Sequence, residues 1–125
     1  MKHLLDVNVL LAAIWESHPQ YQAATDWLRG KTVLLCPIAE LGFLRISTQP
    51  RAINAPMDKA RELLEKFAAT PQAQRIADDL PALDSHPDKS DQVTDTYLAD
   101  LAAKHGFRLG TLDVGIKHPA AEVVS

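Results

Sequence analysis

Short apolar runs alternate along this chain with longer segments in which apolar residues recur every three or four positions. Apolar runs of about four to eight residues are typical of buried strands, whereas the three-to-four-residue repeat is typical of helices with one buried stripe. The runs predict strands at 3–7, 32–36, 107–112 and 121–124. Because strands that alternate with helices pair in parallel through right-handed crossovers, the pattern predicts an α/β fold with a central, mainly parallel sheet.

Proline and glycine set the limits of the helical segments. Pro19, Pro37 and Pro71 suit first helical turns, and Gly30 and Gly106 suit the positions just after a helix. Together with the apolar repeat they predict helices at 9–16, 19–29, 37–48, 58–69, 71–80 and 94–105. The remaining segments are predicted as loops at 51–56 and 85–91 and as a short strand at 82–83.

Composition limits the class of protein. With 125 residues, of which 46% are hydrophobic, the chain is long enough for one domain with its own core. The single cysteine, Cys36, excludes a disulfide framework and is expected to pack as a small apolar side chain. The longest apolar stretch is too short to cross a bilayer, and an acid follows the N-terminus too soon for a signal peptide. These features predict a cytoplasmic protein without a membrane partner.

The charge is weakly acidic and unevenly distributed. The net charge of −3 argues against a general nucleic-acid coat protein, which would be basic. Residues 45–66 carry five basic and three acidic side chains, whereas residues 72–100 carry seven aspartates and two basic side chains. Two interpretations stay open: a solvated surface, or a phosphate-attracting face beside an acidic pocket.

Four acids separated in sequence stand where a strand gives way to a helix or just inside that helix: Asp6, Glu40, Asp95 and Asp113. In a parallel sheet these positions lie at one edge, so the four side chains are expected to share a pocket. Carboxylates in one pocket repel each other and raise each other's pKa, and a divalent cation removes that penalty. Oxygen ligands favour Mg²⁺ or Mn²⁺, and such a site is typical of phosphoryl chemistry.

Each acid also has a simpler interpretation. Asp6 can cap the first helix, Glu40 and Asp95 can stabilise a helix dipole, and Asp113 before Gly115 can form a turn. Four such coincidences at one sheet edge are less common than any one of them alone. The shared pocket is therefore the preferred hypothesis.

Three further polar residues belong to the predicted site. Asn8 and Thr111 lie two residues from Asp6 and Asp113, where their side chains can orient the metal-binding carboxylates. The alternative for both is local capping. Arg45 follows Glu40 by five positions and either contacts a substrate phosphate or forms a surface ion pair.

The segments around the four acids resemble the motifs of PIN-domain ribonucleases, and within them the toxins of VapBC-type toxin–antitoxin systems. Leu4-Leu5-Asp6-Val7-Asn8-Val9-Leu10-Leu11 is similar to the opening motif. The other three motifs follow in the family's order, at residues 37–46, 93–102 and 109–113. One departure is Ile116, since the family usually carries an aromatic residue shortly after the fourth acid.

The resemblance covers essentially the whole chain and implies a single nuclease domain at residues 1–125 with a three-layer α/β/α architecture. It further implies one or two Mg²⁺ or Mn²⁺ ions held by the four acids, endonucleolytic cleavage of RNA, a homodimer and a cognate antitoxin. Trp15, Tyr21 and Trp27 are expected in helix packing or, as the alternative, in the dimer interface.

Other functions remain as alternatives. A housekeeping PIN-type RNA-processing nuclease would use the same acids. An aspartyl-phosphate phosphatase needs a second acid two residues after Asp6, where this chain has Asn8. A phosphoacceptor switch or a non-catalytic RNA- or metal-binding domain fits less well, because all four acids are present. The five histidines and one cysteine lack the spacing of a zinc site, and the serines lack that of a nucleophile elbow.

Overall fold

The computed structural model describes residues 2–124 and contains a five-stranded sheet in the order β3-β2-β1-β4-β5. Each pair of neighbouring strands is parallel, which confirms the α/β fold class. The strands are β1 (His3–Leu5), β2 (Val33–Leu35), β3 (Ala73–Arg75), β4 (Arg108–Thr111) and β5 (Ala121–Val123).

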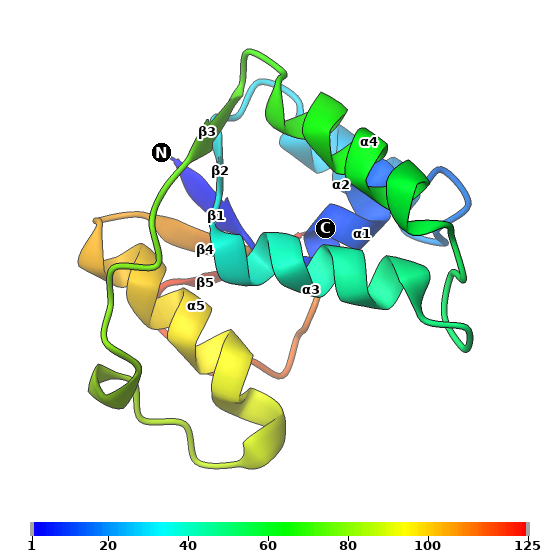
Figure 1. Ribbon diagram of the computed structural model, residues 1–125. Coiled ribbons are helices and arrows are strands. Elements are labelled where there is room, and N and C mark those ends of the chain that lie inside the picture. Colours follow the sequence, from blue (N-terminus) through cyan, green and yellow to red (C-terminus); the bar gives the residue numbers. More distant parts are fainter. Residues whose placement is uncertain (1, 125) are drawn as a thin grey trace.

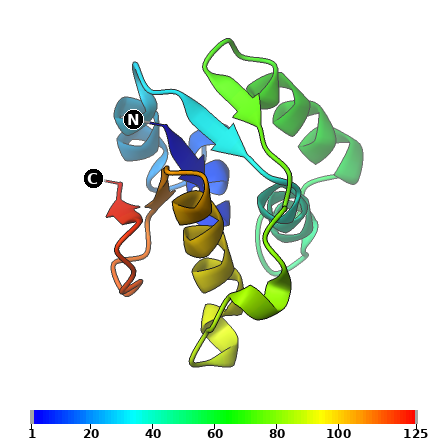
Figure 2. The same ribbon diagram turned by 90° about the vertical axis from the view of Figure 1, so that its left-hand side faces the viewer.

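Helices cover both faces of the sheet and produce the expected three layers (Figures 1 and 2). Helices α1 to α4 lie on one face and α5 lies on the other (Figure 1). Right-handed crossovers require this division, because the chain moves outward from β1 to β3 and then returns past β1 to β4. The helices are α1 (Val7–Ile14), α2 (Tyr21–Leu28), α3 (Pro37–Thr48), α4 (Met57–Ala68) and α5 (Val93–Lys104), with 3-10 turns η1 (Ala82–Asp84) and η2 (Ser90–Gln92).

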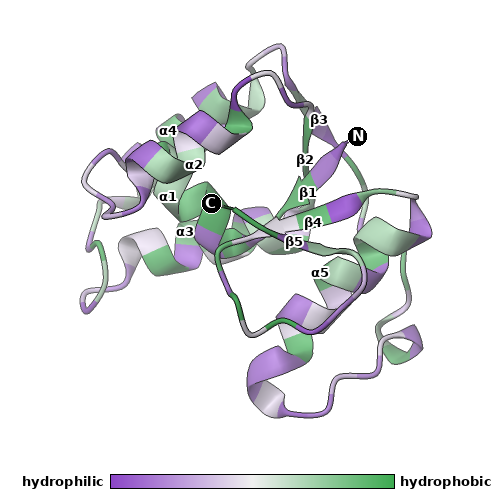
Figure 3. Cartoon of the chain, turned by 180° about the vertical axis from the view of Figure 1, so that it is seen from behind, coloured by the Kyte–Doolittle hydropathy of each residue, from purple (hydrophilic) through white to green (hydrophobic). Residues whose placement is uncertain are grey.

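The central strands are apolar because both of their faces are covered. Every residue of β1 and β2 is buried, and so are Leu109 to Thr111 of β4. Helices α1 and α5 supply the facing side chains, among them Leu10 and Leu101, both fully buried. Figure 3 shows hydrophobic segments, in green, on α1 and on the central strands. Among residues 2–124, no helix is both long and apolar enough to cross a membrane.

Two of the aromatic residues considered for a dimer interface, Trp15 and Trp27, are partly buried and pack against the core. The Trp15 ring stacks on Phe43 at a centroid distance of 6.3 Å, and its Nε1 donates to Ser47 Oγ at 2.8 Å. The ring of Trp27 meets His3 edge-on and lies directly over Gly110. These contacts confirm the helix packing expected of both tryptophans, and because the two side chains are only partly buried, the dimer interface stays a prediction.

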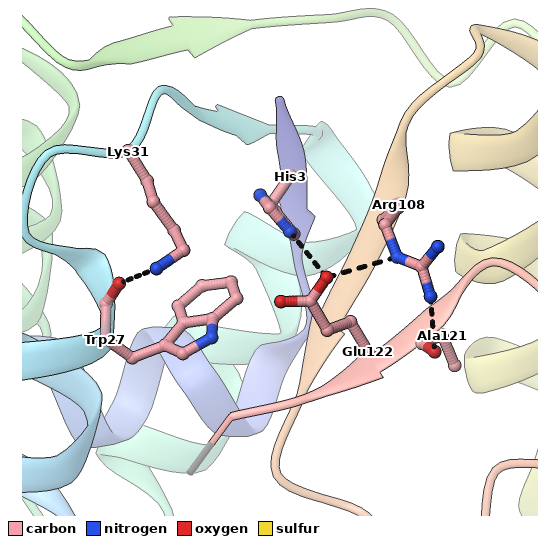
Figure 4. A network of polar contacts seen from close by, with 6 residues as sticks. All are labelled: His3, Trp27, Lys31, Arg108, Ala121 and Glu122. Carbon is pink, nitrogen blue, oxygen red and sulfur yellow. Dashed lines mark hydrogen bonds and ion pairs between the residues drawn. The ribbon is translucent and has the colours of Figure 1, made fainter. Parts of the chain in front are cut away.

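Charged side chains fasten the edge strand β5 to the two strands beside it. Glu122 of β5 accepts a hydrogen bond from His3 Nε2 at 3.1 Å and pairs with Arg108 Nε at 3.1 Å (Figure 4). The hydrogen bond from His3 is the main reason that the pKa of Glu122 lies below its usual range. Lys31 lies beside this network, with its ammonium 4.5 Å from the Trp27 ring centroid. The contacts join β1, β4 and β5 in a part of the sheet where no helix links the last two strands.

Two predicted elements are wrong. The helix predicted at 71–80 is replaced by strand β3 and an extended segment, because Ala73–Arg75 pairs with β2. Two of the three residues of β3 are exposed, so this edge strand lacks the apolar run that marks buried strands. The strand predicted at 82–83 is the turn η1, with Leu83 90% exposed. Helix α5 begins at Val93, so Thr94 lies within it and does not cap it.

Close packing of β4 against α2 requires a glycine. A Cβ atom at Gly110 would lie 2.8 Å from Cη2 of Trp27, which is closer than carbon atoms normally approach. We expect Gly110→Ala to destabilise the protein by about 1–3 kcal/mol, because the indole ring must shift within the core. Urea denaturation of the purified protein measures this loss as a lower midpoint at unchanged slope.

A Trp27→Phe background provides the control for this prediction, because phenylalanine lacks the outer ring atoms that approach residue 110. The cost of Gly110→Ala should be smaller in that background. Equal losses in both backgrounds would show that contact with the indole ring is not the cause.

Candidate active site

Asp6 lies at the centre of the site, directly after β1 and before the first residue of α1. It is only 2% exposed. Its Oδ1 accepts a hydrogen bond from the backbone N–H of Val7 at 2.7 Å, and its Oδ2 accepts one from Thr111 Oγ1 at 2.8 Å. Burial raises the pKa of Asp6, the two hydrogen bonds oppose that rise, and the charge of Asp113 adds to it. Asp6 thus caps α1 and also presents a fixed carboxylate at the sheet edge.

Thr111 connects the groups around Asp6. Besides donating to Asp6, its Oγ1 accepts from the backbone N–H of Asp113 at 3.1 Å and from Asn8 Nδ2 at 3.4 Å. Asn8 Oδ1 in turn accepts from the backbone N–H of Leu112 at 3.1 Å. These contacts join the end of β4 to the first turn of α1. Asn8 and Thr111 therefore fix both the side chain of Asp6 and the backbone that carries Asp113.

Asp95 lies half-buried in the first turn of α5, on the other side of the sheet from α1. Its pKa is raised to about 6, first by burial and then by the negative charges of Asp6, Asp113 and Asp91. The fold therefore brings Asp6, Asp95 and Asp113 close enough to repel one another. Asp91, in η2, is a further acid near this group that the sequence interpretation had not selected.

Asp113 is exposed and follows β4 by two residues. Its Oδ1 accepts a hydrogen bond from the backbone N–H of Gly115 at 2.8 Å. This is the turn contact expected of an aspartate before glycine. Asp113 forms this turn and its charge also acts on Asp6 and Asp95. A role in the turn therefore does not exclude a role in a shared acidic pocket.

Glu40 lies in the first turn of α3, as expected, but its carboxylate contacts an arginine. Arg75, the last residue of β3, donates to Glu40 Oε2 from Nη2 at 3.0 Å and from Nε at 3.3 Å. The side chain of Glu40 is 15% exposed and that of Arg75 is 62% exposed, so the guanidinium keeps donors available to solvent. Both contacts use one oxygen of Glu40.

Sequence reasoning missed Arg75 because it placed the residue within a helix. The available signal was its charge, since Arg75 is one of two basic residues among seven aspartates at 72–100. Arg45, which the sequence suggested instead, is exposed in the last turn of α3. The helical rise places it about 7.5 Å along the axis from Glu40. The arginine in contact with one of the four acids is Arg75.

The donor set suits a hard divalent cation. Asp6, Asp95 and Asp113 offer only oxygen atoms, and their mutual repulsion decreases when a cation binds between them. As placed, no three acidic, histidine or cysteine side chains among residues 2–124 converge into a complete ligand cluster. Mg²⁺ needs only one or two protein carboxylates, because it retains several of its waters. Asp113 is exposed and Asp95 is half-buried, so neither carboxylate is closed off from solvent.

Comparison with known proteins agrees with the fold. The family model described as PIN domain matches residues 3–122. The chain is 35% identical to Ribonuclease VapC38 of Mycobacterium tuberculosis over 121 residues, which cover 90% of this chain and 86% of that protein. It is 33% identical to Ribonuclease VapC29 of the same organism over 129 residues, which cover 98% and 94%.

A solved structure shares the architecture. The chain matches a structure of VapBC2 from Rickettsia felis bound to a DNA fragment from its promoter, with a TM-score of 0.69, 15% identity and complete coverage of both chains. This likeness concerns the fold. The match to the family model and the two relatives each extend over most of the sequence. The chain therefore belongs to the PIN-domain family, where it resembles proteins that are named as VapC ribonucleases.

Proposed function

We propose that this protein is a metal-dependent endoribonuclease that serves as the toxin of a toxin–antitoxin pair. The observation that carries the proposal is the placement of Asp6, Asp95 and Asp113 at one sheet edge, where each aspartate's charge acts on another. Two relatives at 33–35% identity are named as ribonucleases. A group of repelling carboxylates on a rigid sheet edge is suited to Mg²⁺ or Mn²⁺, as phosphodiester hydrolysis requires.

The residues have separate roles in this proposal. Asp6, Asp95, Asp113 and Glu40 would hold the cation, which would polarise the scissile phosphate and activate a water. Thr111 and Asn8 hold Asp6 and the backbone of Asp113 in place through the hydrogen bonds described above. Such supporting contacts commonly decide how well carboxylates bind a metal.

Arginine contributes at the substrate side of the site. Arg75 keeps Glu40 in place with two N–H groups and leaves other donors exposed, so it can bind an RNA phosphate while still paired. Arg45 remains a second candidate for phosphate binding, farther along α3. Because the chain is acidic overall, RNA affinity rests on few such contacts, and its salt dependence should be shallow.

Exposed apolar side chains near the acids suggest a surface for a protein partner. Leu41, Val93 and Val114 are 64%, 51% and 84% exposed, and they lie within two residues of Glu40, Asp95 and Asp113. Apolar side chains beside an acidic site suit a partner segment that brings apolar and basic residues together. We infer an antitoxin that inhibits by placing a basic side chain among the acids, and a homodimer as the working form.

The central test is RNA cleavage by the purified protein with Mg²⁺ or Mn²⁺. We expect wild type to cut cellular RNA at defined sites and to stop when EDTA removes the metal. Asp6→Asn and Asp95→Asn should each lower the rate by about 100-fold or more, since a ligand is lost while the side-chain shape is kept. Mapping of new RNA ends measures the cleavage.

Asp88→Asn is the matched control, because Asp88 is an exposed aspartate in the loop before η2. It should cut at the wild-type rate. Cleavage that persists in the Asp6→Asn and Asp95→Asn proteins would refute the proposed site.

The raised pKa of Asp95 predicts how stability changes with pH in protein stripped of metal. The pKa of about 6 lies above the ordinary value of 3.8, so ionisation of Asp95 weakens the fold. The stability that comes with protonated Asp95 is fully present below about pH 4 and is lost as pH rises through about 6. We expect Asp95→Asn to stabilise the protein near pH 7 by about 1 kcal/mol, after allowance for solvent screening. This corresponds to a rise in Tm of roughly 3 °C.

Thermal unfolding between about pH 4 and pH 7 measures this effect, and the gain from Asp95→Asn should disappear at the acidic end. Mg²⁺ should raise the Tm of wild type more than that of the variant, because binding to the folded state alone stabilises it. Parallel pH profiles for the two proteins would contradict a strained carboxylate at residue 95.

The hydroxyl of Thr111 can be tested without changing the acids. Thr111→Val keeps the side-chain shape but removes the donor to Asp6, so we expect metal affinity or cleavage to fall by about 10-fold to 100-fold. Isothermal titration with Mn²⁺ measures the affinity. Thr70→Val serves as the control, because Thr70 Oγ1 bonds only the carbonyl of Phe67 in an exposed turn. Unchanged Mn²⁺ affinity in Thr111→Val would show that the hydroxyl does not position Asp6.

A further inference from the structure

A pocket of about 380 Å³ opens between the first turns of α3 and α5. Ile38 lines it from α3, Val93 and Thr94 line it from α5, and the segment after β3 closes the remaining side. Figure 2 shows this segment running past the start of α3 before it reaches α5. The volume falls within the range of about 300–1,000 Å³ that is usual for small-ligand sites.

The pocket lies next to the proposed active site. Ile38 precedes Glu40 by two residues in the first turn of α3, and Thr94 directly precedes Asp95 in α5. A ligand can therefore place one group in the pocket and another among the acids. None of the roles assigned above to the acids or to Arg75 uses this space.

Buried polar atoms line the pocket without partners. Ser85 is 8% exposed, and its Oγ makes no hydrogen bond within residues 2–124. Asp78 lines the same space, with its Oδ2 accepting from the backbone N–H of Ile38 at 3.1 Å and its Oδ1 without a hydrogen bond. An unsatisfied buried group costs about 1–3 kcal/mol, so the hydroxyl of Ser85 is suited to a polar group that enters from outside.

The charge and the walls of the pocket define what it can hold. Asp78 places a carboxylate there, and its negative charge contributes to the raised pKa of Cys36, of which burial is the main cause. That charge disfavours a phosphate. The walls are apolar and include Ile38, Leu80 and the ring of Tyr97, whose hydroxyl already donates to the carbonyl of Leu80 at 2.8 Å. A flat, neutral ring with N–H donors at its edge matches this lining.

We propose that the pocket binds a nucleobase of the RNA, turned out of its stack beside the phosphate that is cut. Ser85 Oγ hydrogen-bonds the polar edge of the base, and Asp78 Oδ1 accepts from a base N–H. Guanine fits best, because its edge carries adjacent N–H donors. The proposal rests on the proposed ribonuclease function and assigns a base preference to it. Recognition of unstacked bases by apolar packing and edge hydrogen bonds is general among RNA-binding proteins.

Nucleotide titration tests the pocket independently of cleavage. Backbone NMR spectra of the full chain are recorded with GMP, AMP, CMP or UMP, and with inorganic phosphate as the control for the phosphate group. We expect GMP to shift the signals of Ser85, Thr94 and Tyr97 more than UMP does, and phosphate alone to leave them unchanged. Equal shifts with phosphate, or no shifts at these residues with any nucleotide, would overturn the proposal.

Two variants test the predicted hydrogen bonds. Ser85→Ala removes no hydrogen bond from the free protein, so its Tm should equal or exceed that of wild type, while its preference for guanine falls by about threefold to tenfold. Asp78→Asn keeps an acceptor for the Ile38 N–H but turns the free position into a donor, which should shift the preference toward bases with carbonyl edges. Ser47→Ala is the control: it removes a buried hydroxyl that accepts from Trp15, and should lower Tm without changing base preference.

The outcomes separate this inference from the proposed function. If wild type cuts RNA and Asp6→Asn does not, but Ser85→Ala and Asp78→Asn keep the wild-type base preference, the nucleobase pocket is refuted and the nuclease stands. If wild type cuts no RNA, the nuclease proposal fails and the nucleotide titration still decides the pocket. If the two variants weaken dimer formation or antitoxin binding and leave nucleotide binding unchanged, the occupant is a protein side chain and the inference is overturned.

Discussion

The hydrogen bond from Thr111 to the buried carboxylate of Asp6 is the contact on which the acidic edge of this protein depends. It joins the end of β4 to the start of α1, and therefore crosses the point at which the strand order reverses. Without it, a carboxylate that is 2% exposed would retain only the N–H of Val7 as a partner. A buried charge with so little support is costly, and the hydrogen bond from Thr111 opposes the rise in the pKa of Asp6 that burial causes.

Asp95 and Asp113 add electrostatic repulsion around this fixed carboxylate. Asp95 enters from α5, on the opposite face of the sheet, and Asp113 follows the strand that carries Thr111. The charges of Asp6 and Asp113 add to burial in raising the pKa of Asp95, and the charge of Asp113 adds to burial in raising that of Asp6, so the folded protein gives up stability near neutral pH to keep these groups together. Such a cost is typical of functional sites, where a ligand recovers it on binding. The carboxylate of Glu40, in contrast, is paired with the guanidinium of Arg75.

The two halves of this edge suggest a division of labour in the proposed reaction. The three aspartates form the side that suits a cation, and Glu40, the fourth proposed ligand, uses one carboxylate oxygen to pair with Arg75, which keeps donors for a phosphate. Between α3 and α5 lies the pocket with Ser85 and Asp78, where a base is held in the further proposal. The phosphate would then be recognised by Arg75 at the end of β3, and the base by Asp78 and Ser85 in the segment that follows β3.

The sequence by itself determined the parallel α/β architecture and the edge at which the acids lie. Apolar runs at β1, β2 and β4, with helical repeats between them, leave few other arrangements, and the carboxyl ends of parallel strands share an edge. The sequence also selected Asn8 and Thr111, since short polar residues beside a strand end can reach the neighbouring carboxylate.

Tertiary structure alone decided the contacts that depend on long-range pairing. Strand β3 is stabilised by hydrogen bonds to β2 rather than by an apolar pattern, so local periodicity could not reveal it, and the partner of Glu40 was missed with it. The ring of Trp27 over Gly110 likewise depends on how α2 crosses the sheet. The pocket that brings Ser85 and Asp78 to the first turns of α3 and α5 joins segments that no short-range pattern connects, because backbone pairing and packing between distant elements create it.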